Sequence, residues 1–280
     1  MCGIVAAVSK SNISNVLVEG LKHLEYRGYD SSGIAFIKNN NIKSYKKEGK
    51  VSELAKSLDQ KLNATIGIAH TRWATHGKPL EKNAHPHISE DNIAVVHNGI
   101  IENYKEIQSK FLQDTVLQSD TDSEILAHLI NYYVKKNNFL DSVLLALKEV
   151  KGSYAIAVID KNNPDKIIVA RNGSPLLIGL GDEANYVASD AQALIEHTNK
   201  FIYLEDGDLA EITKENIKIL DKNQNVVLRN IKNSSLSLSS NSKDGYEHFM
   251  LKEIFEQPEA VRATIQDRII NNKVPKEILG

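Results

Sequence analysis

Apolar and polar positions follow a strand-like pattern at the start of the chain and after Gly152, and a helical period in between. The spacing predicts helices over residues 15–24, 51–62, 104–111, 122–133 and 140–150. Short apolar runs predict strands over residues 3–8, 33–37, 42–47, 65–71, 92–97, 154–159, 166–170, 176–179, 186–188, 201–204, 208–212, 217–220 and 226–231. We find no internal repeat.

The order of these elements indicates the fold class. Strands, then helices, then many strands lack the regular alternation of a doubly wound parallel sheet. Packed antiparallel sheets with helices outside, an α+β arrangement, are therefore expected. Residues 231–245, rich in Ser, Asn and Lys, predict a linker between a domain over residues 1–230 and a tail over 246–280, of which residues 246–270 have a helix-like pattern. That tail is interpreted as the truncated start of a second domain.

Composition narrows the class of protein. The net charge of −2 does not indicate binding to nucleic acid or to an anionic membrane. No stretch approaches the roughly 20 apolar residues of a spanning helix, and the N-terminus lacks the features of a signal peptide. A single cysteine cannot form an internal disulfide, which fits a reducing compartment. A cytoplasmic protein is expected.

That cysteine, Cys2, directly follows the initiator Met1. Removal of the methionine would give one residue both a thiol and a free α-amine. The amine, with a pKa of about 7.7–8.0, can act as the base for the thiol beside it. An ordinary buried cysteine behind a start codon is the alternative from position alone.

Three further stretches carry candidate chemistry. His70 to Gly77 places Arg72, Trp73, Thr75 and His76 at the end of a strand, where the guanidinium suits a carboxylate. The alternative is that Trp73 is a core residue and that Arg72 pairs with a surface acid.

Asn98 and Gly99 offer two adjacent neutral donors for an oxyanion, although Asn-Gly after a strand is usually a turn. Asp122 precedes a helix, where it could cap the helix or bind a substrate ammonium. Five histidines (His70, His76, His85, His87 and His97) raise the question of a metal, but their spacing matches no metal motif. No metal or cofactor is expected, and the glycines form no phosphate-binding fingerprint.

Six ordered motifs carry a resemblance that covers essentially the whole chain. They are Cys-Gly-Ile-Val from position 2, Glu-Tyr-Arg-Gly-Tyr-Asp-Ser at 25–31, His-Thr-Arg-Trp-Ala-Thr-His-Gly at 70–77, Asn-Ala-His-Pro-His at 83–87, His-Asn-Gly-Ile-Ile-Glu-Asn at 97–103 and Thr-Asp-Ser-Glu at 121–124. Together they resemble the glutaminase domain of the glutamine–fructose-6-phosphate aminotransferases, which are hexosamine-forming synthases.

The resemblance implies a four-layer αββα sandwich of the N-terminal nucleophile hydrolase class. Cys2 would be the nucleophile and its α-amine the base, while Asn98 and Gly99 would form the oxyanion hole. Arg72, with Thr75 and His76, would hold the α-carboxylate of L-glutamine, and Asp122 its ammonium. Trp73 would belong to a mobile glutamine loop over residues 72–79. Arg27 would order the surroundings of the nucleophile.

The resemblance also implies partners. Ammonia would pass to fructose 6-phosphate in a sugar-phosphate isomerase half, of which residues 246–280 are the start, and the full-length enzyme would be a homodimer. Two alternatives remain open at this point. One is the glutaminase domain of another amidotransferase, such as an amidophosphoribosyltransferase, although Tyr29 separates the two groups. The other is an inactive regulatory relic.

Overall fold

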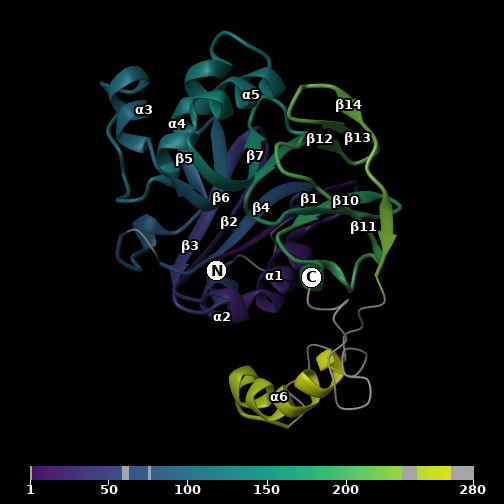
Figure 1. Ribbon diagram of the computed structural model, residues 1–280. Coiled ribbons are helices and arrows are strands. Elements are labelled where there is room, and N and C mark those ends of the chain that lie inside the picture. The colour runs from purple at the N-terminus through teal and green to yellow at the C-terminus, as the bar shows by residue number, and fades with distance from the viewer. Residues whose placement is uncertain (1, 59–62, 75–76, 235–244, 266–280) are drawn as a thin grey trace, which may run out of the picture. The chain divides into compact units, whose positions relative to one another are not determined.

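Two antiparallel sheets stack face to face between two layers of helices in the computed structural model (Figure 1). The structure describes residues 2–58, 63–74, 77–234 and 245–265. Within these ranges, the predicted α+β sandwich of four layers, αββα, is confirmed.

The first sheet has β1 and β4 near its centre. Its strands, in spatial order, are β15 (Ile231–Asn233), β11 (Lys200–Tyr203), β9 (Leu177–Leu180), β10 (Ala184–Ala188), β1 (Gly3–Ser9), β4 (Ile66–Arg72), β2 (Ser31–Lys38) and β3 (Asn41–Glu48). β1 is buried along its whole length because it pairs with β10 on one side and β4 on the other. The N-terminus is therefore threaded into the middle of the sheet rather than along its edge.

The second sheet ends on a short strand beside β6. Its order is β14 (Val226–Val227), β13 (Ile217–Leu220), β12 (Leu209–Thr213), β8 (Lys166–Asn172), β7 (Gly152–Asp160), β6 (Ile93–Ile101) and β5 (His87–Ser89). β6 pairs with β7 over its full nine residues, whereas β5 covers only its first part, with His87 opposite Val95. Beyond Val95, none of the strands in the described ranges pairs with this edge of β6.

Helices cover the outer face of each sheet. The first sheet is covered by α1 (Ser14–His23) and α2 (Val51–Ser57). The second sheet is covered by the helical layer of α3 (Tyr104–Phe111), α4 (Ser123–Val134) and α5 (Phe139–Glu149) (Figure 1). Three single turns of 3₁₀ helix, η1 (Glu25–Arg27), η2 (Glu81–Asn83) and η3 (Ala191–Leu194), complete the description of this part of the chain.

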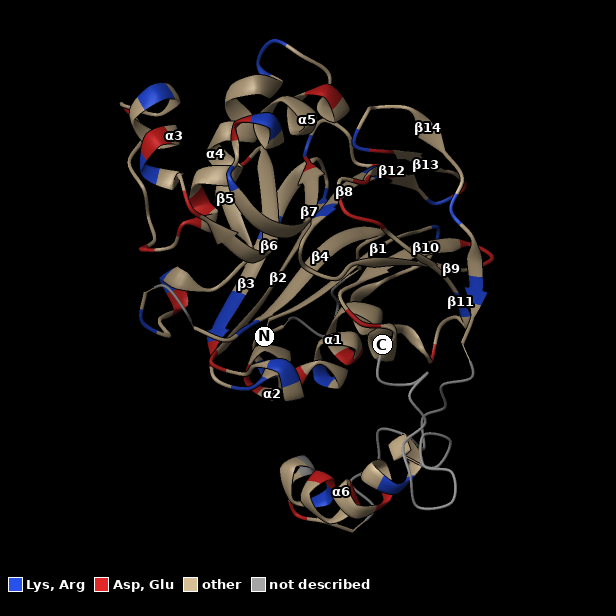
Figure 2. Ribbon diagram, in the orientation of Figure 1, with Lys and Arg blue, Asp and Glu red and all other residues tan. Residues whose placement is uncertain are grey.

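Alternation along the strands produces three apolar layers. On β4, Ile66 and Ile68 face the second sheet, whereas Ala69 faces α1 and α2. On β6, Ala94 and Val96 face the first sheet, and their neighbours face α4. Charged residues gather on the helices and along the edge strand β3, whereas the central strands β1 and β4 carry almost none (Figure 2).

One strand prediction is wrong. The run predicted as a single strand over 226–231 is two short strands, because β14 pairs with β13 in the second sheet and β15 pairs with β11 in the first. Exposed Leu228 lies where the chain crosses between the sheets. Part of the predicted 51–62 helix, residues 59–62, lies outside the described residues, and α2 itself ends at Ser57.

Contacts divide the chain into two units, Met1–Ser237 and Leu238–Gly280. β15 occupies the first three residues of the predicted linker, and residues 235–244 of that linker lie outside the described residues. In the second unit, α6 (Phe249–Ile265) contains Pro258. None of the helices in the described ranges is long and apolar enough to cross a membrane.

Candidate active site

Cys2 lies at the start of β1, where the first sheet faces β6. The backbone N–H of Trp73 donates to Cys2 Sγ at 3.3 Å, and Cys2 Sγ in turn lies 3.6 Å from the carbonyl oxygen of Trp73. Both contacts follow from the sheet, because Gly3 pairs with Thr71 and so places residue 2 beside the end of β4. The thiol is thereby held at a fixed position.

The surroundings of Cys2 keep its thiol protonated. Burial raises the pKa of the Cys2 thiol, and this effect outweighs the hydrogen bond from Trp73 and the positive charge of Arg72, which both lower it. Because the thiolate is the reactive form, nucleophilic attack by Cys2 requires a base.

Asn98 and Gly99 continue β6 and do not form a turn, so the turn alternative is wrong. Asn98 Nδ2 donates to the carbonyl oxygen of Cys2 at 3.1 Å, which joins the two sheets at the thiol. Gly99 has a φ of +139°, and a Cβ atom there would lie 2.0 Å from the carbonyl oxygen of Ser153. Only glycine fits this position.

Arg72 and Asp122 bring opposite charges to the same cavity as Cys2. Arg72 is buried, and its guanidinium donates to the carbonyl oxygens of Lys78 at 3.1 Å and Gly77 at 3.4 Å. Asp122 occupies the N-cap position of α4, but its side chain does not cap the helix. Its Oδ2 instead accepts from the backbone N–H of Ile101 at 2.7 Å.

The cavity itself is small, with a volume of about 30 Å³. Its walls are Cys2, Arg72, Trp73, His85, His97, Gly99, Thr121, Asp122 and Ser123. A water molecule needs roughly 10–15 Å³ by this kind of measure. The cavity thus has room for about two or three water molecules in this conformation, and a larger ligand requires the rim to move.

The remaining predicted site residues have different positions. Trp73 is half exposed, so the core alternative for it is wrong. Thr75 and His76 lie outside the described residues. Arg27 is buried and donates to Asp190 at 3.1 Å and to the carbonyl oxygen of Ser189. Ser189 Oγ accepts from the N–H of Ile4, so Arg27 supports the start of β1.

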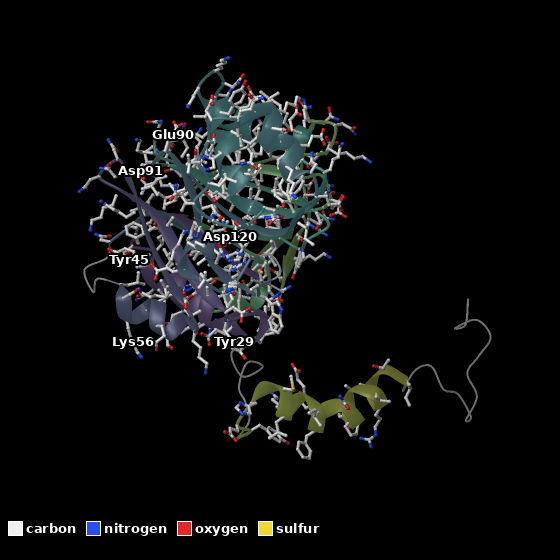
Figure 3. All side chains as sticks on the ribbon, turned by 90° about the vertical axis from the view of Figure 1, so that its left-hand side faces the viewer. Tyr29, Tyr45, Lys56, Glu90, Asp91 and Asp120 are labelled. Atoms are coloured by element: carbon white, nitrogen blue, oxygen red, sulfur yellow. The ribbon has the colours of Figure 1, made fainter. Side chains whose placement is uncertain are left out.

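Acidic and amide side chains fix the rim of the cavity. Asp30 Oδ2 accepts from the N–H of Ala74 at 2.8 Å, immediately after Trp73. Asn83 donates to the carbonyl oxygen of Lys78 and to Asp120, whose own N–H donates back to Asn83 Oδ1. Figure 3 labels Asp120 near the middle of the face it shows. Asp30 lies in the loop motif 25–31, but its position in that loop gave no sign of this contact.

Four of the five histidines lie at or near the cavity, and two of them, His85 and His97, form part of its wall. His70, His85, His87 and His97 are buried, and burial lowers the pKa of each, that of His70 to about 3. Neutral imidazoles can ligate metals, but each of these rings contacts protein groups. Among the described residues, no group of three or more His, Cys, Asp or Glu side chains is arranged to hold a metal ion.

Known proteins similar to this chain include glutamine amidotransferases. A family model described as a glutamine amidotransferase domain matches residues 70–196. The chain is 48% identical over 282 residues to the glutamine–fructose-6-phosphate aminotransferase (isomerizing) of Acinetobacter baylyi, and 50% identical over 284 residues to that of Idiomarina loihiensis. Each match covers 100% of this chain but 46% and 47% of the two relatives, so the chain spans about half of their length.

Solved structures give the same fold. A glutamine phosphoribosylpyrophosphate amidotransferase from B. subtilis superposes with a TM-score of 0.68 at 25% identity, covering 80% of this chain and 50% of that chain. A regulatory enzyme of purine biosynthesis gives a TM-score of 0.67 at 27% identity, with the same coverage of each chain. The sandwich described above is therefore one that amidotransferases share.

Proposed function

The chain carries a glutamine amidotransferase domain related to that of the glutamine–fructose-6-phosphate aminotransferases, and on this basis we propose that it hydrolyses L-glutamine through Cys2. The observation that carries the proposal is the single cavity joining the thiol of Cys2, the guanidinium of Arg72 and the carboxylate of Asp122. Glutamine has a carboxylate and an ammonium at one end and an amide at the other. The cavity offers one group for each.

The nucleophile needs a base, because burial keeps the thiol of Cys2 protonated. Removal of Met1 converts the amide nitrogen of Cys2 into an amine with a basic lone pair. That amine takes the thiol proton, and the thiolate attacks the side-chain carbonyl carbon of glutamine.

The oxyanion that forms is held by Asn98 and Gly99. On the exposed edge of β6, the N–H of His97 is taken by His85 and that of Ile101 by Asp122. Alternation along the strand turns the N–H of Gly99, between them, toward the same edge. Asn98 Nδ2 lies beside Cys2 and carries a second N–H besides the one given to the Cys2 carbonyl oxygen.

Charge selects the orientation of the substrate. Arg72 binds the α-carboxylate, with Thr75 and His76 adding donors, and Asp122 binds the α-ammonium. Because the cavity is too small for glutamine, the segment that contains Trp73 opens for binding and closes afterward. Both ends of glutamine are then fixed, and only its amide reaches Cys2.

The reaction balances in two steps. The protonated amine gives its proton to the leaving nitrogen, which departs as ammonia and leaves a γ-glutamyl thioester on Cys2. Water then adds to the thioester, and glutamate leaves as the thiol is restored. No metal or cofactor is needed for either step.

The fate of the ammonia is proposed from the relatives. The chain is about twice as similar to the fructose-6-phosphate aminotransferases as to the phosphoribosylpyrophosphate amidotransferase in sequence identity. We therefore propose that the ammonia converts fructose 6-phosphate to glucosamine 6-phosphate in an isomerase half that follows residue 245. We also propose that the full-length protein is a cytoplasmic homodimer.

Substitution of Cys2 tests the proposed function. Cys2→Ala should lower ammonia release from glutamine by at least about 10³-fold, and Cys2→Ser should also lower it severely, because the nucleophile is lost or weakened. Ammonia and glutamate are measured together, with circular dichroism to check the fold. Retention of Met1 by an aminopeptidase inhibitor should also inactivate the protein. Near-normal ammonia release from Cys2→Ala contradicts the assignment.

A further inference from the structure

Two stacked imidazoles lie directly behind the proposed oxyanion donors. We propose that His70 and His85 are positioning residues that clamp the backbone of His97 and the amide of Asn98, and so aim the donors of Asn98 and Gly99. This inference rests on the proposed function, because it assigns a role within the same reaction.

The first observation concerns the edge of β6. β5 begins at His87, opposite Val95, so its ladder ends before the next outward-facing residue, His97. The N–H of His97 donates to His85 Nδ1 at 3.2 Å, and its carbonyl oxygen accepts from His70 Nε2 at 3.1 Å. Two side chains therefore replace the missing strand at the residue that precedes Asn98.

The second observation concerns the amide of Asn98. Its Nδ2 donates to the carbonyl oxygen of Cys2, so its Oδ1 is an acceptor. His70 Nε2 lies 3.0 Å from that Oδ1 and also faces the carbonyl oxygen of His97, so Nε2 carries the proton. This one N–H selects the amide orientation that points Nδ2 at the nucleophile.

The third observation is the chemical form of the rings. His85 Nδ1 accepts a hydrogen bond, which a protonated imidazole could not do. The two rings stack with centroids 4.2 Å apart and an interplanar angle of 14°, and both are buried. Burial lowers the pKa of both histidines, which keeps the rings neutral. The clamp is therefore intact at neutral pH.

The fourth observation argues against simple space filling. His70 Nδ1 is buried and has no hydrogen-bond partner among the described residues. Leaving a buried polar atom without a hydrogen bond carries a desolvation cost. Leu or Phe would fill the volume without that cost, so the ring is explained by what its other nitrogen does.

The test distinguishes the orientation of the oxyanion donors from the nucleophilicity of Cys2. His70→Leu removes the donor, whereas His70→Gln keeps an N–H, because the amide nitrogen of Gln reaches about as far as His Nε2. For His70→Leu we expect kcat for glutamine hydrolysis to fall by about 10- to 100-fold, with KM within about threefold. His70→Gln should restore kcat to within about threefold. At His85, the pair is His85→Leu and His85→Asn, since the Oδ1 of Asn replaces Nδ1.

Alkylation by iodoacetamide supplies the second readout. The thiolate displaces iodide from carbon, so a C–S bond forms and a C–I bond breaks without an oxyanion. The alkylation rate of Cys2 in His70→Leu should therefore match that of the unsubstituted protein. His128→Leu serves as the control. His128 lies on α4, where its ring contacts Ser89 of β5 and Glu124 of α4, and no hydrogen bond joins it to Asn98 or Cys2. Its ratio of kcat to alkylation rate should be unchanged.

Three results overturn the proposal. They are an unchanged kcat in His70→Leu, a parallel fall in alkylation and kcat, or equal losses in His70→Leu and His70→Gln. Failure of the proposed function is recognised separately, because Cys2→Ala would then still release ammonia whatever His70 does.

Discussion

Two parts of the layer between the sheets differ in chemistry although they lie on the same strands. In the middle, Ile68 on β4 and Val96 on β6 belong to one apolar cluster, and both are fully buried. Two residues further along each strand, His70 and Asn98 take the same faces and join in a hydrogen bond. The layer thus changes from apolar to polar within one repeat of each strand.

The difference shows how the sandwich builds a site. Apolar contacts hold the sheets together without specifying the direction of any group. Hydrogen bonds at the end of the layer specify direction, but they depend on neutral rings and on complete partners. The apolar middle of the layer therefore stabilises the fold and sets the distance between the sheets, and the polar end orients the groups of the site.

Lowering the pH should have the largest effect on the polar end of the layer, because it lowers the free energy of unfolding through the buried histidines. The pKa values of His70, His85, His87 and His97 are lowered by burial, so the folded protein leaves them neutral while the unfolded chain protonates them below about pH 6.5. The unfolded state then binds more protons, and the free energy of unfolding falls as pH falls. Each histidine contributes about 1.4 kcal/mol per pH unit between about pH 6.5 and its folded pKa.

Glu124 adds to this loss at lower pH. Its pKa is lowered to about 2 by hydrogen bonds from His128, Gln118 and Ser119, which outweigh the opposing effect of burial, so its contribution is lost below about pH 4.5. Urea unfolding at pH 7, 6 and 5 measures the slope. His87→Gln should reduce it by about 1.4 kcal/mol per pH unit, because the pKa of His87 is lowered well below its ordinary value. A stability that is flat from pH 7 to 5 contradicts the account.

A change in the middle of the layer should have a smaller and different effect. Ile68→Val removes one buried methylene and should lower the free energy of unfolding by about 0.5–1.5 kcal/mol. Because the side chain of Ile68 orients no polar group of the site, kcat and KM for glutamine should stay within about twofold. Thermal unfolding and steady-state kinetics check both values. A fall in kcat comparable to that of His70→Leu would remove the distinction between the two parts.

Much of the fold could be predicted from the sequence because its signals are local. Apolar runs placed β1, β4 and β6, and the change of texture at Gly152 marked the second group of strands. The run over 226–231 misled because periodicity reports burial and extension but not the sheet to which a strand belongs. The three-residue β5 is too short to leave a periodic signal.

The site was predictable to a different degree. Motifs identified Cys2, Arg72, Asn98, Gly99 and Asp122, and the structure brings all five to one end of the sandwich. The relation of His70 and His85 to Asn98 could not be predicted, because stacking and tautomer depend on residues from separate strands. In the sequence, His70 and His85 drew attention only as possible metal ligands, and their spacing matches no metal motif.

One measurement tests the central claim most directly. A glutamine-like diazo or epoxy ketone should label the catalytically active protein once, and peptide mass spectrometry should place the label on a peptide that begins at Cys2, without Met1. Loss of ammonia release should follow the extent of labelling. Two results would contradict the account. One is a labelled peptide that still carries Met1 in a sample that released ammonia before labelling, and the other is a label on any other residue.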